Sequence, residues 1–173
     1  MTSRAFTTGA GMVIGLLLSW FIITRLNKDG KFRTEYDERQ KEVRGTAYRY
    51  AFYAMMICEA VLMVASLEID LGILGSGIHF IPIYVGVIVQ VVYSIMNDGY
   101  FGLNNDTGKY MVFMAVISVF NLLSGVLSLR DCLAEGSELS VPICSLGAGT
   151  LFLAVAAAML AKKFAGGNGG DEE

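Results

Sequence analysis

The chain has few of the residues that most metal sites and enzyme sites require. Its 173 residues include one histidine, three cysteines and two prolines. One histidine makes a poor metal site, because protein zinc sites combine several His and Cys ligands. No Walker lysine loop, HExxH, GxSxG or CxxC pattern occurs, so ATPase, zinc protease, hydrolase and thioredoxin functions lack support. We therefore expect no metal ion and no cofactor, and we rank an enzyme last among the possible functions.

Charge is also scarce, at 17% of residues, and 13 basic and 16 acidic side chains leave a net charge of only -3. That balance gives no reason to expect a nucleic-acid partner. Hydrophobic residues make up 54% of the chain, and the mean hydropathy is +0.56. Both values lie outside the usual range of soluble domains and indicate a membrane protein whose main partner is the lipid bilayer.

Five apolar stretches are each long enough to cross a bilayer, since about 20 helical residues span about 30 Å of hydrocarbon. We predict an all-α integral membrane bundle of about five transmembrane helices within one domain, residues 1–165, followed by a flexible tail, residues 166–173. The predicted spans cover residues 6–25, 48–67, 79–97, 110–129 and 141–162. The segment 71–79 is predicted as an outer loop, with a short re-entrant piece as the alternative.

The lysines and arginines are distributed unevenly between the two sides of this arrangement. Eleven of the 13 fall on one side, and only Arg4 and Arg130 fall on the other. Cytoplasmic segments carry such an excess, so we expect the N-terminus outside, the C-terminus in the cytoplasm and a multi-pass protein of the cell membrane. The first stretch has its positive charges after the apolar run, which favours an uncleaved span over a signal peptide.

A charged segment follows the first span and is predicted to form a short cytoplasmic helix over residues 34–45. Thr34 is a suitable N-cap, acidic residues precede basic ones, and Gly45 allows a bend before the second span. The alternative is a solvated connector whose basic residues only set the topology. If the helix meets another protein, its candidate interaction residues are Asp37, Glu38, Arg39 and Arg44.

The second inner loop, residues 97–108, is rich in turn-forming residues with side-chain oxygens. Asp98 and Asn104 are the candidate interaction residues here. The spacing of the oxygens does not match an EF-hand, so a plain interfacial turn is the alternative.

Two runs within these cytoplasmic segments carry a resemblance to a known group. They are Tyr36-Asp-Glu-Arg-Gln40 with Val43-Arg-Gly-Thr-Ala-Tyr48, and Asp98-Gly-Tyr-Phe-Gly-Leu-Asn104. Together they resemble a group of small uncharacterised multi-span membrane proteins of Gram-positive bacteria, whose members tend to have Ala or Ser in place of Gly99 and Gly102. The resemblance covers a minority of the chain, and it implies fold and location without any activity.

Polar residues at membrane depth form a second candidate site. Counted from the charged inner ends at 1.5 Å per residue, Glu59 lies about 15 Å deep, and one polar residue in each of three other spans lies at a similar level. A carboxylate at this depth is costly and usually faces a bundle interior. We hypothesise that one intramembrane site is formed by Glu59, Gln90, Asn121 and Thr150. The alternative is that the last three only hydrogen-bond between helices.

Two functions therefore remain nearly level. One is an oligomeric transporter or channel for a small solute or ion, with a polar path near Glu59. The other is a regulatory or accessory membrane protein that binds a membrane or cytoplasmic protein through its cytoplasmic face. A homo-oligomer is possible in either case, because Gly11-x-x-x-Gly15 allows close helix approach, although intramolecular packing is the preferred explanation of this motif. Cys132 and Cys144 both lie on the outer side, and the sequence leaves open whether they pair.

Overall fold

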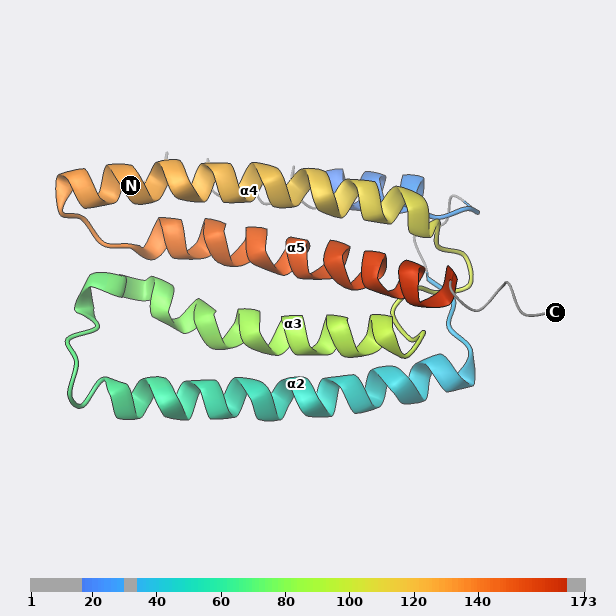
Figure 1. Cartoon of the computed structure of the whole chain (residues 1–173), viewed down its shortest axis with the longest axis horizontal. Helices are drawn as coiled ribbons and strands as arrows, with labels where there is room; N and C mark the ends of the chain where they lie inside the picture. The colour runs from blue at the N-terminus through green and yellow to red at the C-terminus, as the bar shows by residue number, and fades with distance from the viewer. Residues whose placement is uncertain (1–16, 30–33, 168–173) are drawn as a thin grey trace.

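The computed structural model describes residues 17–29 and 34–167, and every regular element in these two ranges is helical (Figure 1). The helices, in chain order, are a short helix Leu17–Leu26, α2 Glu38–Ala65, the 3-10 helix η1 Gly72–His79, α3 Phe80–Met96, α4 Thr107–Glu135 and α5 Ser140–Gly167. Most of the predicted span 6–25 and most of the predicted tail lie outside the described residues.

Four helices are long and apolar enough to cross a membrane: α2, η1 with α3, α4, and residues Ser140–Phe164 of α5. The shortest has 25 residues, or about 37 Å at 1.5 Å per residue, which exceeds a hydrocarbon core of about 30 Å. Only 6% to 28% of their most apolar windows is buried inside the protein. Surfaces this apolar need lipid or another apolar partner, so the chain has the form of a multi-pass membrane protein.

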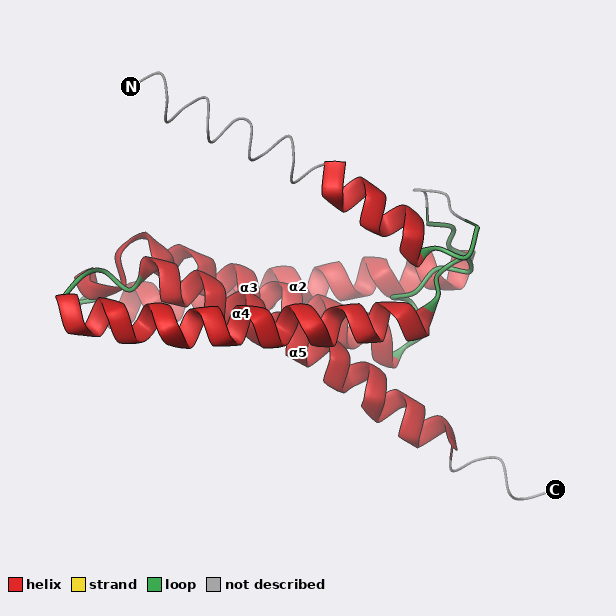
Figure 2. Cartoon of the chain, turned by 90° about the horizontal axis from the view of Figure 1, so that it is seen from above, coloured by secondary structure: helices red, strands yellow, loops and turns green. Residues whose placement is uncertain are grey.

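The long helices lie side by side in the order α2, α3, α5, α4, and the main contacts join the neighbours in that order (Figure 1). In the perpendicular view, α2, α3 and α4 share one layer, while α5 slants out of it toward its C-terminal end (Figure 2). The short helix Leu17–Leu26 lies on the opposite side of the layer. A layer buries fewer side chains than a closed bundle, because each edge helix contacts one neighbour.

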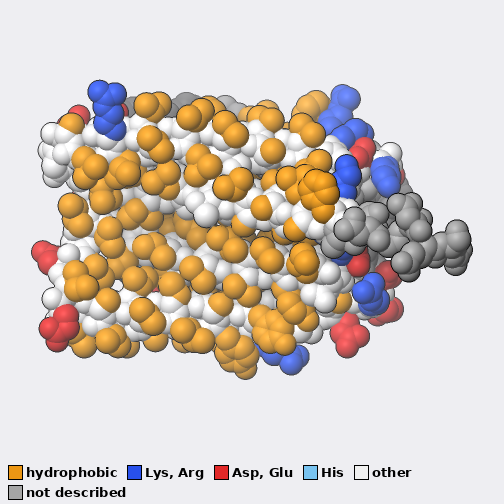
Figure 3. Space-filling view, in the orientation of Figure 1, with side chains coloured by type: hydrophobic (Ala, Val, Ile, Leu, Met, Phe, Trp, Pro, Cys, Tyr) orange, Lys and Arg blue, Asp and Glu red, His pale blue; other side chains and the backbone are white. Residues whose placement is uncertain are grey.

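Apolar and charged side chains occupy different parts of this helical layer. Large apolar side chains cover the middle of the visible face, and charged side chains gather at its two ends (Figure 3). The buried apolar cluster is small and contains Val91, Ile95, Val155, Ala158 and Met159, from α3 and α5. Tyr100, Phe101 and Tyr110 pack against it. The core therefore lies near the α3–α4 loop rather than midway along the helices.

Small residues allow α4 and α5 to approach closely. A Cβ atom at Gly149 would lie 2.7 Å from Cγ of Leu122, and one at Gly125 would lie 2.7 Å from Cγ of Leu146. The Ser118 hydroxyl, which is 1% exposed, donates to the carbonyl of Gly149 at 2.9 Å. Small residues and one such hydrogen bond are typical of helix pairs in membranes. The sequence analysis did not single out Ser118.

The structure differs from the expected separate cytoplasmic helix. Asp37, not Thr34, caps α2: its side chain accepts from the amide of Gln40 at 2.7 Å, and the Gln40 side chain accepts from the amide of Asp37 at 3.2 Å. This capping box fixes the start at Glu38. The helix then continues through Gly45 to Ala65. A helical glycine costs only about 1 kcal/mol, and nearby Ala47 is fully buried, so packing outweighs the expected bend.

The segment expected to be a loop or a re-entrant piece is the 3-10 helix η1, which packs against the start of α5. The amide of Leu139 donates to the carbonyl of Ile73 at 2.8 Å, and the amide of Gly77 donates to the Ser140 hydroxyl at 3.3 Å. Gly75 has a φ of 52°, which glycine adopts without strain. This end of the layer is closed by backbone contacts and holds none of the candidate site residues.

Candidate functional site at the motif junction

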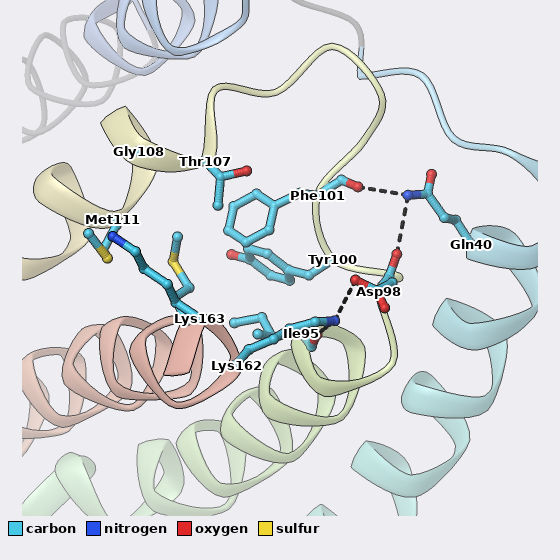
Figure 4. A pocket seen from close by; sticks show the side chains of 11 residues that line it. Gln40, Ile95, Asp98, Tyr100, Phe101, Thr107, Gly108, Met111, Lys162 and Lys163 are labelled. Carbon is cyan, nitrogen blue, oxygen red and sulfur yellow. Dashed lines mark hydrogen bonds and ion pairs between the residues drawn. The ribbon is translucent and has the colours of Figure 1, made fainter. Parts of the chain in front are cut away.

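The two segments that carry the resemblance lie against each other, and we name their contact region, residues 34–48 with residues 97–110, the motif junction. The side-chain amide of Gln40 donates to the carbonyls of Asp98 at 3.2 Å and Phe101 at 2.9 Å (Figure 4). The amide of Leu103 donates to the carbonyl of Glu35 at 2.9 Å, and the amide of Glu35 donates to the Asn104 side chain at 3.2 Å. Segments about 60 residues apart are thus joined through backbone groups.

Glycine makes this contact possible at two positions. A Cβ atom at Gly99 would collide with the side chain of Val43, and one at Gly102 would collide with Thr34 and the carbonyl oxygen of Glu35. A clash with backbone cannot be relieved by a change of rotamer. Ala or Ser at either position would therefore not fit the junction as this chain forms it.

A third segment also enters the junction. The buried side chain of Asn105 donates to the side chain of Asn27 at 2.6 Å and accepts from the amide of Gly102 at 2.7 Å. The amide of Lys28 donates to the carbonyl of Asn104 at 2.7 Å. Buried polar groups are retained where they are hydrogen-bonded, so this pair of asparagines ties the end of the first helix to the α3–α4 loop. Neither asparagine is among the candidate residues predicted from the sequence.

The end of α5 is attached to the junction by an ion pair. Asp98, whose φ is 60°, follows the C-terminal end of α3, and its carboxylate lies 2.5 Å from the ammonium of Lys162. Lys162 also donates to the carbonyl of Ile95 at 2.7 Å, where α3 ends (Figure 4). A cation at a helix C-terminus satisfies a free carbonyl and interacts favourably with the helix dipole. Lys162 is not among the candidate residues predicted from the sequence.

The junction contains two cavities that share Tyr100 and Phe101 as a common wall. The larger, about 480 Å³, lies between α3, α4 and α5. Its charged side is formed by Asp98, Lys162 and Lys163, while Met111 and Met159 line its apolar side (Figure 4).

The smaller cavity, about 370 Å³, surrounds Arg44. The guanidinium lies 4.3 Å from the centre of the Tyr36 ring and 5.9 Å from that of Tyr48. It donates to the hydroxyls of Tyr36 at 3.0 Å and Tyr48 at 3.2 Å. Both contacts orient the guanidinium without neutralising it, because phenols are uncharged at neutral pH and cation–π contacts leave the charge in place.

Tyr100 forms the wall between the cavities and remains protonated. Burial raises the pKa of its phenol above the ordinary value of 10.0, the neighbouring Tyr36 and Tyr110 raise it further, and Arg44 lowers it. The carbonyl of Tyr100 accepts from the Tyr36 hydroxyl at 3.4 Å. The wall is therefore neutral, and among the residues that the structure describes, Arg44 is the sole charged side chain that lines the smaller cavity.

The predicted cytoplasmic residues divide into two sets. Arg44, Asp98 and Asn104 lie in the junction, and Asn104 also donates to the carboxylate of Asp29 at 3.2 Å. Asp37 acts as the helix cap. Glu38 pairs with Lys41 on the exposed side, where Arg39 is exposed as well, and such pairs contribute little to stability.

The intramembrane polar residues are not brought together. Glu59 is exposed on α2, whose main contact among the long helices is with α3. Asn121 and Thr150 each hydrogen-bond to the carbonyl four residues earlier, at 2.9 and 2.8 Å, and Gln90 donates to Ser94 at 3.4 Å within α3. The hypothesis placed the four side chains at one site inside a bundle, whereas none of these three hydrogen bonds joins one helix to another. Gln90 lines the Arg44 cavity instead.

Within residues 17–29 and 34–167, no group of three or more His, Cys, Asp or Glu side chains is placed to hold a metal ion. Cys58, Cys132 and Cys144 are free thiols, so the structure does not pair the two outer cysteines.

No protein-family model, no curated protein and no solved structure matches the chain. The geometry of the junction, together with the membrane-spanning form of the helices, therefore carries the functional argument by itself.

Proposed function

We propose that this protein is a regulatory or accessory protein of the cell membrane and that it binds its partner or ligand at the motif junction. One observation carries the proposal: three segments distant in sequence are hydrogen-bonded into one structure that encloses two cavities. Ordered loops with concave, partly charged surfaces are typical of binding sites. The excess of lysine and arginine on this side supports a cytoplasmic location for the junction.

Photo-crosslinking of full-length protein in cells tests this proposal. A photoreactive residue would replace Lys163, at the mouth of the larger cavity, or Leu67, beyond the far end of α2. We expect a discrete adduct from position 163 and none from position 67. Gln40→Ala, which removes the hydrogen bonds across the junction, should abolish the adduct, whereas Lys41→Ala, a change at an exposed neighbour, should preserve it. Equal labelling from both ends, or an adduct unaffected by Gln40→Ala, would contradict the proposal.

A second candidate is an oligomeric transporter, and the exposure of Glu59 favours it. Glu59 lies in the last third of α2, nearly midway in sequence between Arg49 and Glu68, and its side chain is exposed. A carboxylate facing lipid is costly, and contact with a second copy of the chain would remove that cost.

Proteoliposome flux separates the two candidates. A transporter should carry a proton-coupled flux that Glu59→Gln abolishes and Glu68→Gln, beyond the end of α2, leaves intact. The accessory function predicts no flux above that of empty liposomes from either protein. Flux that both variants retain would count against Glu59 as part of the path.

A further inference from the structure

Arg44 carries a positive charge that no described acidic residue neutralises. The ion pairs in the described ranges join Lys41 to Glu38, Lys109 to Asp106 and Lys162 to Asp98. Arg44 is half-buried and uses two of its N–H donors on phenolic oxygens. A guanidinium presents five donors in a planar fork, so it retains donors for an anion after both bonds are made.

The rest of the cavity lining suits the same charge. Tyr36, Tyr48, Gln90 and Asn105 bring neutral hydroxyl and amide groups, and no carboxylate of residues 17–29 or 34–167 lines this cavity. An oxyanion would therefore meet one cation and several neutral polar groups without repulsion. Guanidinium groups bind phosphate oxygens in pairs, through two parallel N–H···O bonds.

An apolar groove continues from this cavity along the outside of α2 and α3. The groove, about 260 Å³, shares Tyr48, Val87 and Gln90 with the Arg44 cavity. Its other lining residues are Ala51, Phe52, Met55, Ile83 and Gly86. A Cβ atom at Gly86 would lie 3.2 Å from the carbonyl oxygen of Ala51, so the missing side chain lets α2 and α3 approach closely beside the groove. A cationic cavity that opens into an apolar groove matches a molecule with an anionic head and a hydrocarbon chain.

We infer that the Arg44 cavity and the adjoining α2–α3 groove bind one anionic phospholipid, with its phosphate against the Arg44 guanidinium and an acyl chain in the groove. The position agrees with this occupant, because Arg44 lies at the basic end of the layer, where the positive-inside rule places the cytoplasmic headgroups. The inference rests on the proposed function in one respect: it assigns the ligand of one of the two junction cavities.

Native mass spectrometry of the full chain in a neutral detergent tests the inference. The probes are dioleoylphosphatidylglycerol and dioleoylphosphatidylcholine, which share acyl chains and differ in net charge. We expect the wild type to bind the phosphatidylglycerol more tightly. Arg44→Gln should weaken that binding about tenfold, the scale of one charge-assisted hydrogen-bonded pair, while Arg39→Gln, an exposed arginine on the same helix, should change it less than about twofold.

Two further variants keep the test decisive if Arg44→Gln unfolds the protein. Arg44→Lys retains the charge but loses the planar fork, so it should weaken phosphatidylglycerol binding by less than Arg44→Gln does. Val87→Phe should reduce binding by filling the groove while Arg44 stays in place, and Val112→Phe on the exposed face of α4 is its control. Thermal melting in lipid-free detergent checks that each variant is folded.

Three results would overturn the inference. Equal losses of phosphatidylglycerol binding in Arg44→Gln and Arg39→Gln would show that general surface charge, and not Arg44 itself, attracts the lipid. Equal affinity of the wild type for the two lipids would show that Arg44 does not select the anionic lipid. Displacement of the lipid by inorganic phosphate at comparable concentration would show a soluble anion instead. The crosslinking at position 163 probes the other cavity, so either proposal can fail while the other stands.

Discussion

Polar side chains behave differently at the motif junction and in the middle of the helical layer. At the junction, Gln40 and Asn105 bond to groups more than 55 residues away in sequence. In the middle, Asn121 and Thr150 bond to the preceding turn of their own helix. The junction contacts are specific to this fold, because they require a particular pairing of loops. The mid-layer contacts need only a helix in lipid, which leaves tertiary specificity there to small residues and to Ser118.

The largest loss of stability is expected where a side chain is added at the closest contact of the motif junction. Gly102→Val places a side chain against the carbonyl of Glu35, so we expect a loss of about 2–3 kcal/mol or failure to fold. Thermal unfolding in detergent measures it. Gly45→Ala is the control: it lies in a helix with open space around it and should stabilise the protein by about 1 kcal/mol. Equal effects at the two glycines would contradict the close contact.

Removing the Gln40 side chain comes next in size. Gln40→Ala leaves the carbonyls of Asp98 and Phe101 without this donor and breaks the capping box, so about 2 kcal/mol should be lost. Lys41→Ala, which removes only an exposed pair with Glu38, should cost less than about 0.5 kcal/mol. Similar losses in both would mean that the junction adds little stability.

The contact between α4 and α5 should respond more weakly. Ser118→Ala removes the buried bond to Gly149, and such bonds average about 0.6 kcal/mol in membranes. Thr150→Ala removes a bond within its own helix and should leave stability nearly unchanged. The two variants are compared in the same unfolding assay, and a larger loss for Thr150→Ala would refute this distinction.

The smallest effect concerns pH at the start of α4. Hydrogen bonds from Lys109 and the amide of Gly108 lower the pKa of the exposed Asp106 below its ordinary value of 3.8. Because the folded pKa is the lower one, the contribution of Asp106 is complete above its unfolded pKa and is lost as the pH falls through the folded pKa. Asp106→Asn should flatten the stability profile between about pH 5 and pH 2. An unchanged slope would contradict this assignment.

The sequence predicted the helical class well, because lipid imposes a simple length and hydropathy requirement on each spanning helix. Pro82 lies in the first turn of α3 and Pro142 in that of α5, close to the predicted starts of these two spans at residues 79 and 141. The sequence did not predict that α3 packs on α5 rather than on α4, since uniformly apolar helices carry little information about their neighbours. The hypothesis that Glu59 meets three other polar residues required knowing which helices are neighbours, and the sequence does not show this.

The junction was predicted only in pieces. Arg44, Asp98 and Asn104 were identified as candidates because polar and charged residues concentrate in the two cytoplasmic segments. Their assembly depends on Gln40, Gly99 and Gly102, whose roles exist only once two distant segments meet. No local periodicity or spacing encodes such a meeting. In the sequence, Lys162 likewise indicates only the membrane topology. Its ion pair with Asp98, at 2.5 Å, is recognised only in the folded structure.

Hydrogen exchange of the full chain in lipid nanodiscs tests the central claim most directly, by comparing the loops at the two ends of the layer. The amide of Leu103 in the 98–106 loop bonds to the distant segment at Glu35, so that loop should exchange slowly in the wild type and quickly in Gln40→Ala. The 66–70 loop, which no such bond ties to another segment, should exchange quickly in both. A 98–106 loop that exchanges as fast as the 66–70 loop in the wild type would contradict an ordered motif junction.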